Sequence, residues 1–222
     1  MQEQSAVQKW KEDLASWAIP QDILDQAEVP PWFHPAALFA LPVEIWDSPS
    51  HQRAREAMPE GGTVLDIGCG GGIAAFAIAP PAKHLIGVDH QQEMLAMFRA
   101  NAEERGLTSE VFEGFWPAIA DQVPVADVVT CHHVVYNVGD IKDFVEALQS
   151  HARIRVVIEL PLVHPMTPRS AGWKHFWNVT RPTVPVAGDL ITVLDELGIK
   201  ANIEYFESEI LLDKKVDGAN GF

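Results

Sequence analysis

Short apolar runs alternate with stretches of helical spacing along most of this chain. The runs lack the strict alternation of a half-exposed strand, a pattern typical of strands buried on both faces of a sheet. The expected strands comprise residues 63–67, 84–89, 110–113, 126–131 and 155–160, and the expected helices comprise residues 50–58, 72–78, 91–105 and 141–151. Asp140 is the expected N-cap of the last helix. This regular alternation predicts an α/β fold with a mostly parallel sheet.

The pattern becomes irregular beyond residue 160, where Pro and Trp are frequent, and resumes near residue 187. Residues 187–197 predict another helix and residues 201–206 another strand. No internal repeat and no linker between two self-sufficient parts is found. We therefore expect one domain over residues 50–222, preceded by an extension.

The extension, residues 1–49, has its own helical pattern. Apolar positions recur three and four residues apart over residues 5–18, at Val7, Trp10, Leu14 and Trp17. Pro20 ends this helix, a second short helix is expected around Ile23, and the prolines of residues 30–35 then break regular structure. Such a helical extension can cap a substrate cleft, or its tryptophans can simply pack on the core, and the two roles are compatible.

Composition places the chain among globular enzymes. With 222 residues, of which 47% are hydrophobic and 21% charged, it can bury a sizeable core. No apolar run approaches the roughly 20 residues that span a bilayer, and the charged N-terminal residues lack a signal-peptide core. We expect a cytoplasmic protein without a membrane partner. Cys69 and Cys131 agree with a reducing compartment, as packing residues or as a redox pair.

The formal net charge of −15 argues against nucleic acid as a partner. A negatively charged protein repels polyanions and offers few contacts that release counterions. Nothing in the pattern specifies an oligomeric state.

The most informative segment joins an apolar run to an acid and a glycine-dense turn, Val64-Leu65-Asp66-Ile67-Gly68-Cys69-Gly70-Gly71-Gly72. Glycines let a backbone approach a ligand closely. Asp89 ends the next apolar run, 21 residues after Gly68, about where a Rossmann-like fold places its ribose-binding carboxylate. Gly70, Gly72 and Ala75 also fit G-x-G-x-x-A, so a nicotinamide cofactor is an alternative.

Three segments together carry a resemblance to a known family. Asp66 with the three following glycines forms D-x-G-x-G-x-G, and residues 87–95 and 126–134 are similar to the second motif and the fourth strand of class I S-adenosylmethionine (SAM)-dependent methyltransferases. The likeness covers roughly residues 60–160. Residues 113–117, 132–138 and 181–185 also resemble a bacterial subgroup of the family, which does not specify the methyl acceptor. The resemblance implies a Rossmann-like twisted sheet with helices on both faces, in which residues 210–212 would supply a short seventh strand.

The resemblance also implies a cofactor site for SAM. Asp66 would hold the amino group of the cofactor through water, and Asp89 would accept both ribose hydroxyls. The backbone of Gly68, Cys69, Gly70 and Gly72 would accommodate the methionine moiety. His90, Phe115 and Trp116, which follow the second and third strands, would border the adenine.

Candidate catalytic residues follow the fourth and fifth strands, where the crevice of a parallel sheet opens. They are His132, His133, Tyr136 and His164. Methyl transfer needs a base only if the nucleophile carries a proton, and at most one of the two adjacent histidines is expected to face the methyl group. A metal site is not expected, because neither H-E-x-x-H nor paired-cysteine spacing occurs. Arg169 and Arg181 are candidates for binding an acceptor carboxylate.

The leading function is therefore transfer of a methyl group from SAM to an oxygen or nitrogen of a small molecule. An NAD(P)-dependent oxidoreductase is the first alternative. A SAM-binding protein without turnover is the second.

Overall fold

A parallel sheet forms the centre of the residues that the computed structural model describes, 4–28 and 36–207. Its five strands there are β1 Thr63–Ile67, β2 His84–Asp89, β3 Thr108–Glu113, β4 Ala126–His132 and β5 Ala152–Glu159.

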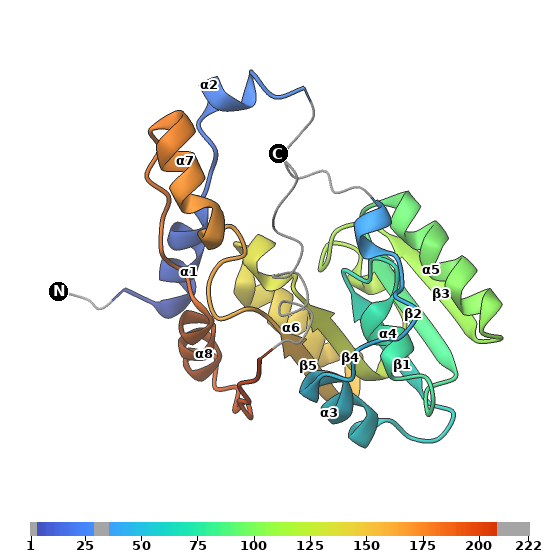
Figure 1. The fold of residues 1–222 in the computed structure, drawn as a ribbon. Coiled ribbons are helices and arrows are strands. Elements are labelled where there is room, and N and C mark those ends of the chain that lie inside the picture. The colour runs from blue at the N-terminus through green and yellow to red at the C-terminus, as the bar shows by residue number, and fades with distance from the viewer. Residues whose placement is uncertain (1–3, 29–35, 208–222) are drawn as a thin grey trace.

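 Their order across the sheet is β3-β2-β1-β4-β5, and β5 ends at Glu159 (Figure 1). The strand order reverses between β1 and β4, so the loops after these two strands border a crevice at the carboxyl edge of the sheet.

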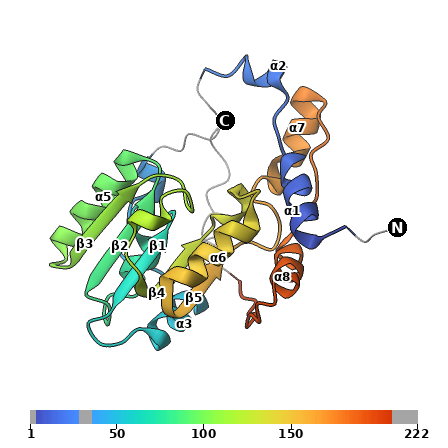
Figure 2. The same ribbon diagram turned by 180° about the vertical axis from the view of Figure 1, so that it is seen from behind.

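Helices cover both faces of the sheet (Figures 1 and 2). One face carries α3 Pro49–Ala57, α4 Ile73–Ala77 and α5 Gln92–Glu104, and the other carries α1 Ala6–Ala15, α6 Ile141–His151 and α8 Ala187–Glu196. The remaining helical segments are α2 Gln21–Leu24, α7 Ser170–Trp177 and the 3-10 turns η1 Ala36–Phe39, η2 Ala120–Gln122, η3 Val135–Asn137 and η4 Thr167–Arg169. Over residues 4–28 and 36–207, no helix has the length and apolar character needed to cross a membrane.

The central strands are apolar because both of their faces are buried. Along β1, Leu65 and Ile67 enter the core beneath α6 and α8, whereas Val64 enters the core beneath α4 and α5. Side chains alternate between the two faces of a strand, so a strand between two helical layers needs apolar residues at nearly every position. The predicted α/β fold with a parallel sheet and helices on both faces is confirmed.

The strand expected at residues 201–206 is wrong. These residues have no regular secondary structure, and the sheet ends at β5 within the described part of the chain. The segment is held by side chains instead, because Arg53 Nε of α3 donates to Glu204 Oε1 at 2.6 Å. The seventh strand expected at residues 210–212 lies outside the described residues.

Two helix starts show how local sequence positions the site. At α3, Ser48 is the N-cap, its Oγ accepts the N–H of His51, and Pro49 occupies the first helical position. At α6, Asp140 is at the predicted N-cap position, but its side chain accepts no N–H from the helix. The carboxylate of Asp140 instead pairs with Lys11 Nζ of α1 at 2.5 Å.

Trp10 and Trp17 of the N-terminal segment pack on the core, as one of the two expected roles requires. Trp10 is 1% exposed, and its Nε1 donates to the carbonyl oxygen of Val138 at 2.8 Å. Trp17 is also buried, and its Nε1 donates to the carbonyl oxygen of Val184 at 2.6 Å. Helix α1 therefore belongs to the same packed layer as α6 and α8.

The burial of Trp10 predicts a large cost for its removal. Trp10→Ala should lower the free energy of unfolding by about 3–5 kcal/mol, because it empties a filled core position and leaves the Val138 carbonyl without its donor. Trp177→Ala is the matched control, since Trp177 is 44% exposed. Urea unfolding followed by circular dichroism measures both. Equal, small losses for the two variants would contradict the packing of α1 into the core.

Candidate cofactor and acceptor site

The loop between β1 and α4 is packed so closely that it tolerates almost no side chain. A Cβ on Gly71 would lie 2.0 Å from the carbonyl oxygen of Phe39 in η1, and a Cβ on Gly68 would lie 2.4 Å from Cγ2 of Val134. Three glycines of the loop have positive φ, of 69° at Gly68, 50° at Gly70 and 97° at Gly72. Bare backbone at the edge of the sheet is suited to close approach of a ligand.

Asp66 is a buried carboxyl group at the end of β1. It is 2% exposed, and Thr130 Oγ1 of β4 donates to its Oδ1 at 2.9 Å. Burial raises the pKa of Asp66 to about 7, against the opposing effect of hydrogen bonds from Thr130 and the backbone of Ala75. The group is thus partly protonated near neutral pH, and a cationic ligand group nearby would favour its charged form.

Asp89, at the end of β2, fastens the glycine loop to the neighbouring strand. Its Oδ2 accepts the N–H of Gly70 at 3.0 Å, and its Oδ1 accepts the N–H of Gln91 at 3.0 Å. A carboxylate has about four acceptor positions, so two remain for ligand hydroxyls. Asp89 is 8% exposed, at the edge where such a ligand would lie.

The three candidates for the adenine border have different surroundings. His90 and Phe115 stack on each other at 4.8 Å with an interplanar angle of 19°, and both are exposed. Trp116 is buried in the core and meets the His151 ring edge-on at 4.8 Å. His90 and Phe115 can thus offer a flat surface to a base, whereas Trp116 fills the core below them.

Cys69 and Cys131 do not form a pair. Both are buried free thiols, and they belong to the two core clusters on opposite faces of the sheet. Burial raises the pKa of both thiols. This arrangement favours packing residues over a redox pair.

His132 ends β4, His133 follows it, and the two side chains have different surroundings. The His133 side chain is 61% exposed, its φ is a left-handed 61°, and its Nε2 lies 3.2 Å from Oε1 of Glu159. The His132 side chain is only 10% exposed, and its Nδ1 lies 3.9 Å from Oε2 of Glu159. Burial lowers the pKa of His132 to about 3, so this imidazole is neutral at physiological pH. Only His133 is open to solvent.

Glu159 is the centre of this cluster. Ser48 Oγ donates to its Oε2 at 3.1 Å, and Ser50 also donates a hydrogen bond to it. Burial by itself would raise the pKa of Glu159, but interactions with His133, His132 and Ser50 together outweigh burial and lower it to about 2. The carboxylate is therefore charged at neutral pH. It also lines a groove of about 1040 Å³ along the outer edge of β5.

His51 lies behind the same carboxylate. Its ring stacks on that of His132 at 5.3 Å, and its Nδ1 lies 3.0 Å from the carbonyl oxygen of Trp46. Because a carbonyl only accepts, Nδ1 of His51 carries the proton. Burial lowers the pKa of His51. Two buried imidazoles thus pack behind the exposed His133 and its largely buried partner Glu159.

Tyr136 and His164 do not join this cluster. The Tyr136 hydroxyl donates to the carbonyl oxygen of Pro161 at 3.0 Å, and burial raises the pKa of Tyr136 to about 12. The His164 ring stacks on Trp17 at 3.8 Å, and its Nδ1 accepts the N–H of Met166. The two rings meet edge-on at 5.3 Å. Their contacts join the N-terminal segment to the loop after β5.

Sequence reasoning misses Glu159, Ser48, Ser50 and His51 as site residues. A signal for Glu159 exists, because it ends an apolar strand as Asp66 and Asp89 do. The other three begin a helix from a different part of the chain, and no local pattern links them to β5. In the described part of the chain, no three His, Cys, Asp or Glu side chains are grouped so as to hold a metal ion.

This fold and loop define a class of protein. A parallel sheet whose strand order reverses between β1 and β4, with a glycine loop after β1 and an acid ending β2, is the arrangement of class I SAM-dependent methyltransferases. A family model described as a methyltransferase domain matches residues 64–155, which span β1 to the start of β5. Over residues 64–155 the chain is therefore similar to this class, whose cofactor is SAM.

Curated relatives agree over the same region. The chain is 36% identical over 91 residues to a ubiquinone biosynthesis O-methyltransferase of Paraburkholderia phytofirmans, which covers 40% of this chain and 39% of that protein. It is 38% identical over 88 residues to the enzyme of the same name from Idiomarina loihiensis, covering 39% of this chain and 36% of that protein. The chain thus matches less than half the length of these relatives.

A solved structure agrees with the fold. A proposed methyltransferase from Bacillus halodurans superimposes with a TM-score of 0.50 at 23% identity, covering 67% of this chain and 66% of that one. The family model and the curated relatives favour a methyltransferase over the nicotinamide alternative.

The buried Asp66 predicts that SAM binding depends on pH. SAM carries an ammonium and a sulfonium charge, so its affinity should rise severalfold between about pH 5.5 and 7.5 as Asp66 ionises. Asp66→Asn should bind SAM more weakly and without this pH dependence, because an amide keeps the contact with Thr130 but cannot ionise. Calorimetric titration at several pH values measures both.

The same carboxyl predicts an opposite effect on the free protein. An acid whose pKa is raised on folding destabilises the folded state as pH rises from about 4 to 7, so Asp66→Asn should melt several degrees above the wild type at pH 8. The difference should be small at pH 4. A variant that melts below the wild type at both pH values would contradict the raised pKa.

Proposed function

We propose that this protein transfers a methyl group from SAM to a hydroxyl group of a small molecule. The observation that carries the proposal is the exposed imidazole of His133 against the charged carboxylate of Glu159, at 3.2 Å. The pair lies where β4 and β5 end, on the side of the sheet where the glycine loop follows β1. A base at this position is of use only to an acceptor that must lose a proton.

The residues around the glycine loop fit the cofactor. Asp89 has free acceptor positions for ribose hydroxyls, Asp66 would receive the amino group through water, and the stacked His90 and Phe115 would border the adenine. The backbone of residues 68–72 would receive the methionine moiety. When bound, SAM supplies an electrophilic methyl group that an oriented nucleophile can attack in line.

His133 would accept the proton of the acceptor hydroxyl. Its Nε2 faces the carboxylate, which only accepts, so Nε2 carries a proton and Nδ1 has the free lone pair. Proton transfer to Nδ1 makes an imidazolium ion, and the charged Glu159 stabilises that ion. Ser48, Ser50 and the buried rings of His132 and His51 would hold Glu159 in place.

Two further observations support an oxygen acceptor of small size. The relatives from Paraburkholderia and Idiomarina are named as O-methyltransferases of ubiquinone biosynthesis. The net charge of −15 disfavours nucleic acid. We also propose that residues 50–222 carry the SAM-binding domain, that residues 1–49 cover it, and that the protein acts in the cytoplasm.

Variants of His133 and Glu159 test this mechanism. With methyl-labelled SAM and a panel of phenols, catechols and amines, label should reach a hydroxyl compound. His133→Asn should lower kcat by about 10²- to 10⁴-fold, since it removes the base, and Glu159→Gln should lower it by roughly tenfold or more. Both variants should bind SAM as the wild type does. His175→Asn, at an exposed histidine of α7, is the matched control.

Two results would contradict the proposal in different ways. Wild-type kcat in His133→Asn would show that His133 is not the base, leaving orientation as the catalytic device. Tight SAM binding without label transfer to any compound would instead support the SAM-binding protein without turnover.

A further inference from the structure

A long stretch after β5 has a charge opposite to that of the protein. Residues 160–188 contain no Asp or Glu, although the whole chain has 31. The same residues include three Arg or Lys side chains and three large aromatic ones in or near α7: Arg169, Lys174, Arg181, Trp173, Phe176 and Trp177. A local patch of positive charge and aromatic surface thus stands on an acidic protein.

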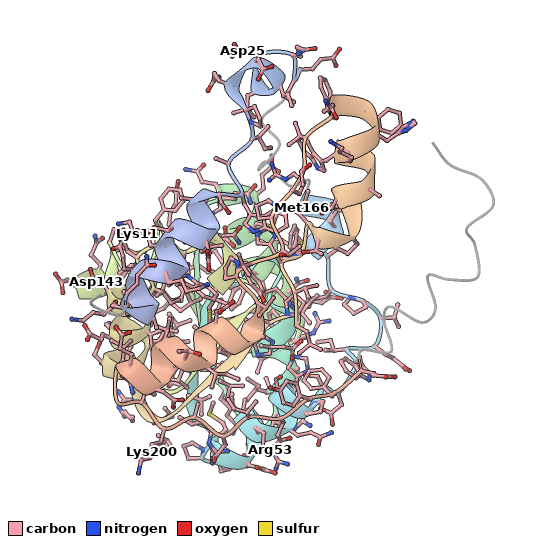
Figure 3. All side chains as sticks on the ribbon, turned by 90° about the vertical axis from the view of Figure 1, so that its left-hand side faces the viewer. Lys11, Asp25, Arg53, Asp143, Met166 and Lys200 are labelled. Carbon is pink, nitrogen blue, oxygen red and sulfur yellow. The ribbon has the colours of Figure 1, made fainter. Side chains whose placement is uncertain are left out.

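Helix α7 presents this patch to solvent. None of its residues is buried, and Lys174, His175, Phe176 and Trp177 are exposed in succession. Phe176 is 73% exposed, far more than an aromatic side chain with a packing role. Figure 3 shows α7 at the outer edge of the molecule, beside α2 and above the labelled Met166, with side chains that project away from the sheet.

A small apolar pocket opens beside the exposed aromatic residues. It has a volume of about 170 Å³, and its walls come from α2 with its flanking residues and from α7: Ile19, Ile23, Leu24, Gln26, Ala27, Trp173 and Trp177. Gln26 is the only polar residue of these walls. The pocket therefore suits an apolar chain segment rather than a polar ligand.

Arg181 is buried beneath this patch. It is 8% exposed, and its guanidinium stacks on Trp173 at 4.9 Å and on Trp17 at 5.2 Å. Its amino groups donate to the carbonyl oxygens of Trp17 and Ala18. No carboxylate pairs with Arg181 within the described ranges. The positive charge beneath α7 is therefore not neutralised by an acid.

We propose that α7 and the adjoining pocket bind the surface of an anionic lipid bilayer. Phe176 and Trp177 would enter the boundary between headgroups and acyl chains, Arg169 and Lys174 would face lipid phosphates, and one acyl chain would reach the pocket. The expectation of no membrane partner rests on the lack of a spanning segment, which does not address contact with a membrane surface.

Salt screening and the acids near the patch set the strength of this contact. Charges farther away than the Debye length of about 8 Å are largely screened at physiological salt, so the patch itself decides whether binding occurs. Asp22 of the neighbouring α2 and Asp25, which follows that helix, are exposed and oppose anionic lipid. We therefore expect reversible binding that weakens as salt rises. α7 follows β5 on the side of the sheet where β5 ends, so a bound membrane would lie near the rim of the acceptor site.

Flotation with lipid vesicles tests the proposal on the full chain without a methyl acceptor. The protein should float with vesicles that contain phosphatidylglycerol and several times less with pure phosphatidylcholine. Phe176→Ser with Trp177→Ser should lower the partition coefficient by about tenfold or more, because these side chains carry the apolar contact. Arg169→Glu with Lys174→Glu should abolish the preference for anionic lipid.

The matched control removes two exposed apolar residues elsewhere. Val43→Ser with Ile154→Ser changes side chains that are 104% and 56% exposed and should bind vesicles as the wild type does. Circular dichroism and SAM affinity should be unchanged in all variants, which separates this proposal from the methyltransferase proposal. Absence of flotation, equal flotation with neutral lipid, or wild-type flotation of the Phe176 and Trp177 variant would each overturn it. Self-association that the same variant abolishes, without vesicle binding, would assign the patch to a second copy of the chain instead.

Discussion

Three carboxyl groups lie at or near the carboxyl ends of the parallel strands β1, β2 and β5, and the site depends on how each one is compensated. Asp66 is buried beside a single hydroxyl and one backbone N–H, so its charge is only partly supported. Asp89 receives two backbone N–H groups. Glu159 receives two serine hydroxyls and an imidazole, so it stays charged. One edge of the sheet therefore offers three acids with three different chemical properties, suited to a cation, to hydroxyls and to an imidazolium ion.

The segment before β1 takes part in the site at two places. η1 packs its Phe39 carbonyl against Gly71 of the loop, and the start of α3 brings Ser48 and Ser50 to Glu159. Helix α1 meanwhile is fixed on the far face of the sheet by Trp10. The chain thus contacts both faces of the sheet before it forms the first strand. Changes in residues 36–51 should consequently affect cofactor and acceptor chemistry as well as stability.

The sequence predicts the central elements well and the periphery poorly, for physical reasons. β1, β2 and β4 are buried on both faces, so their apolar runs identify them without tertiary information. Residues 201–206 also include apolar side chains, but they form no strand. A strand there would need a neighbouring strand to pair with, and local sequence does not specify one. Side-chain direction is also nonlocal. Trp116, Tyr136 and His164 follow strands as site residues do, yet each is turned into packing contacts.

The cluster around Glu159 also shows that local sequence does not determine side-chain direction. His132 and His133 are adjacent in sequence and cannot be told apart there, whereas the structure exposes one and buries the other against His51. Their roles depend on α3, which is more than 70 residues earlier in the chain.

Calorimetric titration of the wild type with SAM, S-adenosylhomocysteine, NAD and NADP tests the central claim most directly, that the edge formed by β1, β2 and β4 is a SAM site. SAM and S-adenosylhomocysteine should bind, NAD and NADP should not, and Asp89→Asn should weaken both productive titrations by about tenfold or more, because a charged acceptor for ribose hydroxyls is lost. Binding of NAD or NADP together with flat SAM titrations, or an Asp89→Asn variant with wild-type affinity, would contradict this assignment.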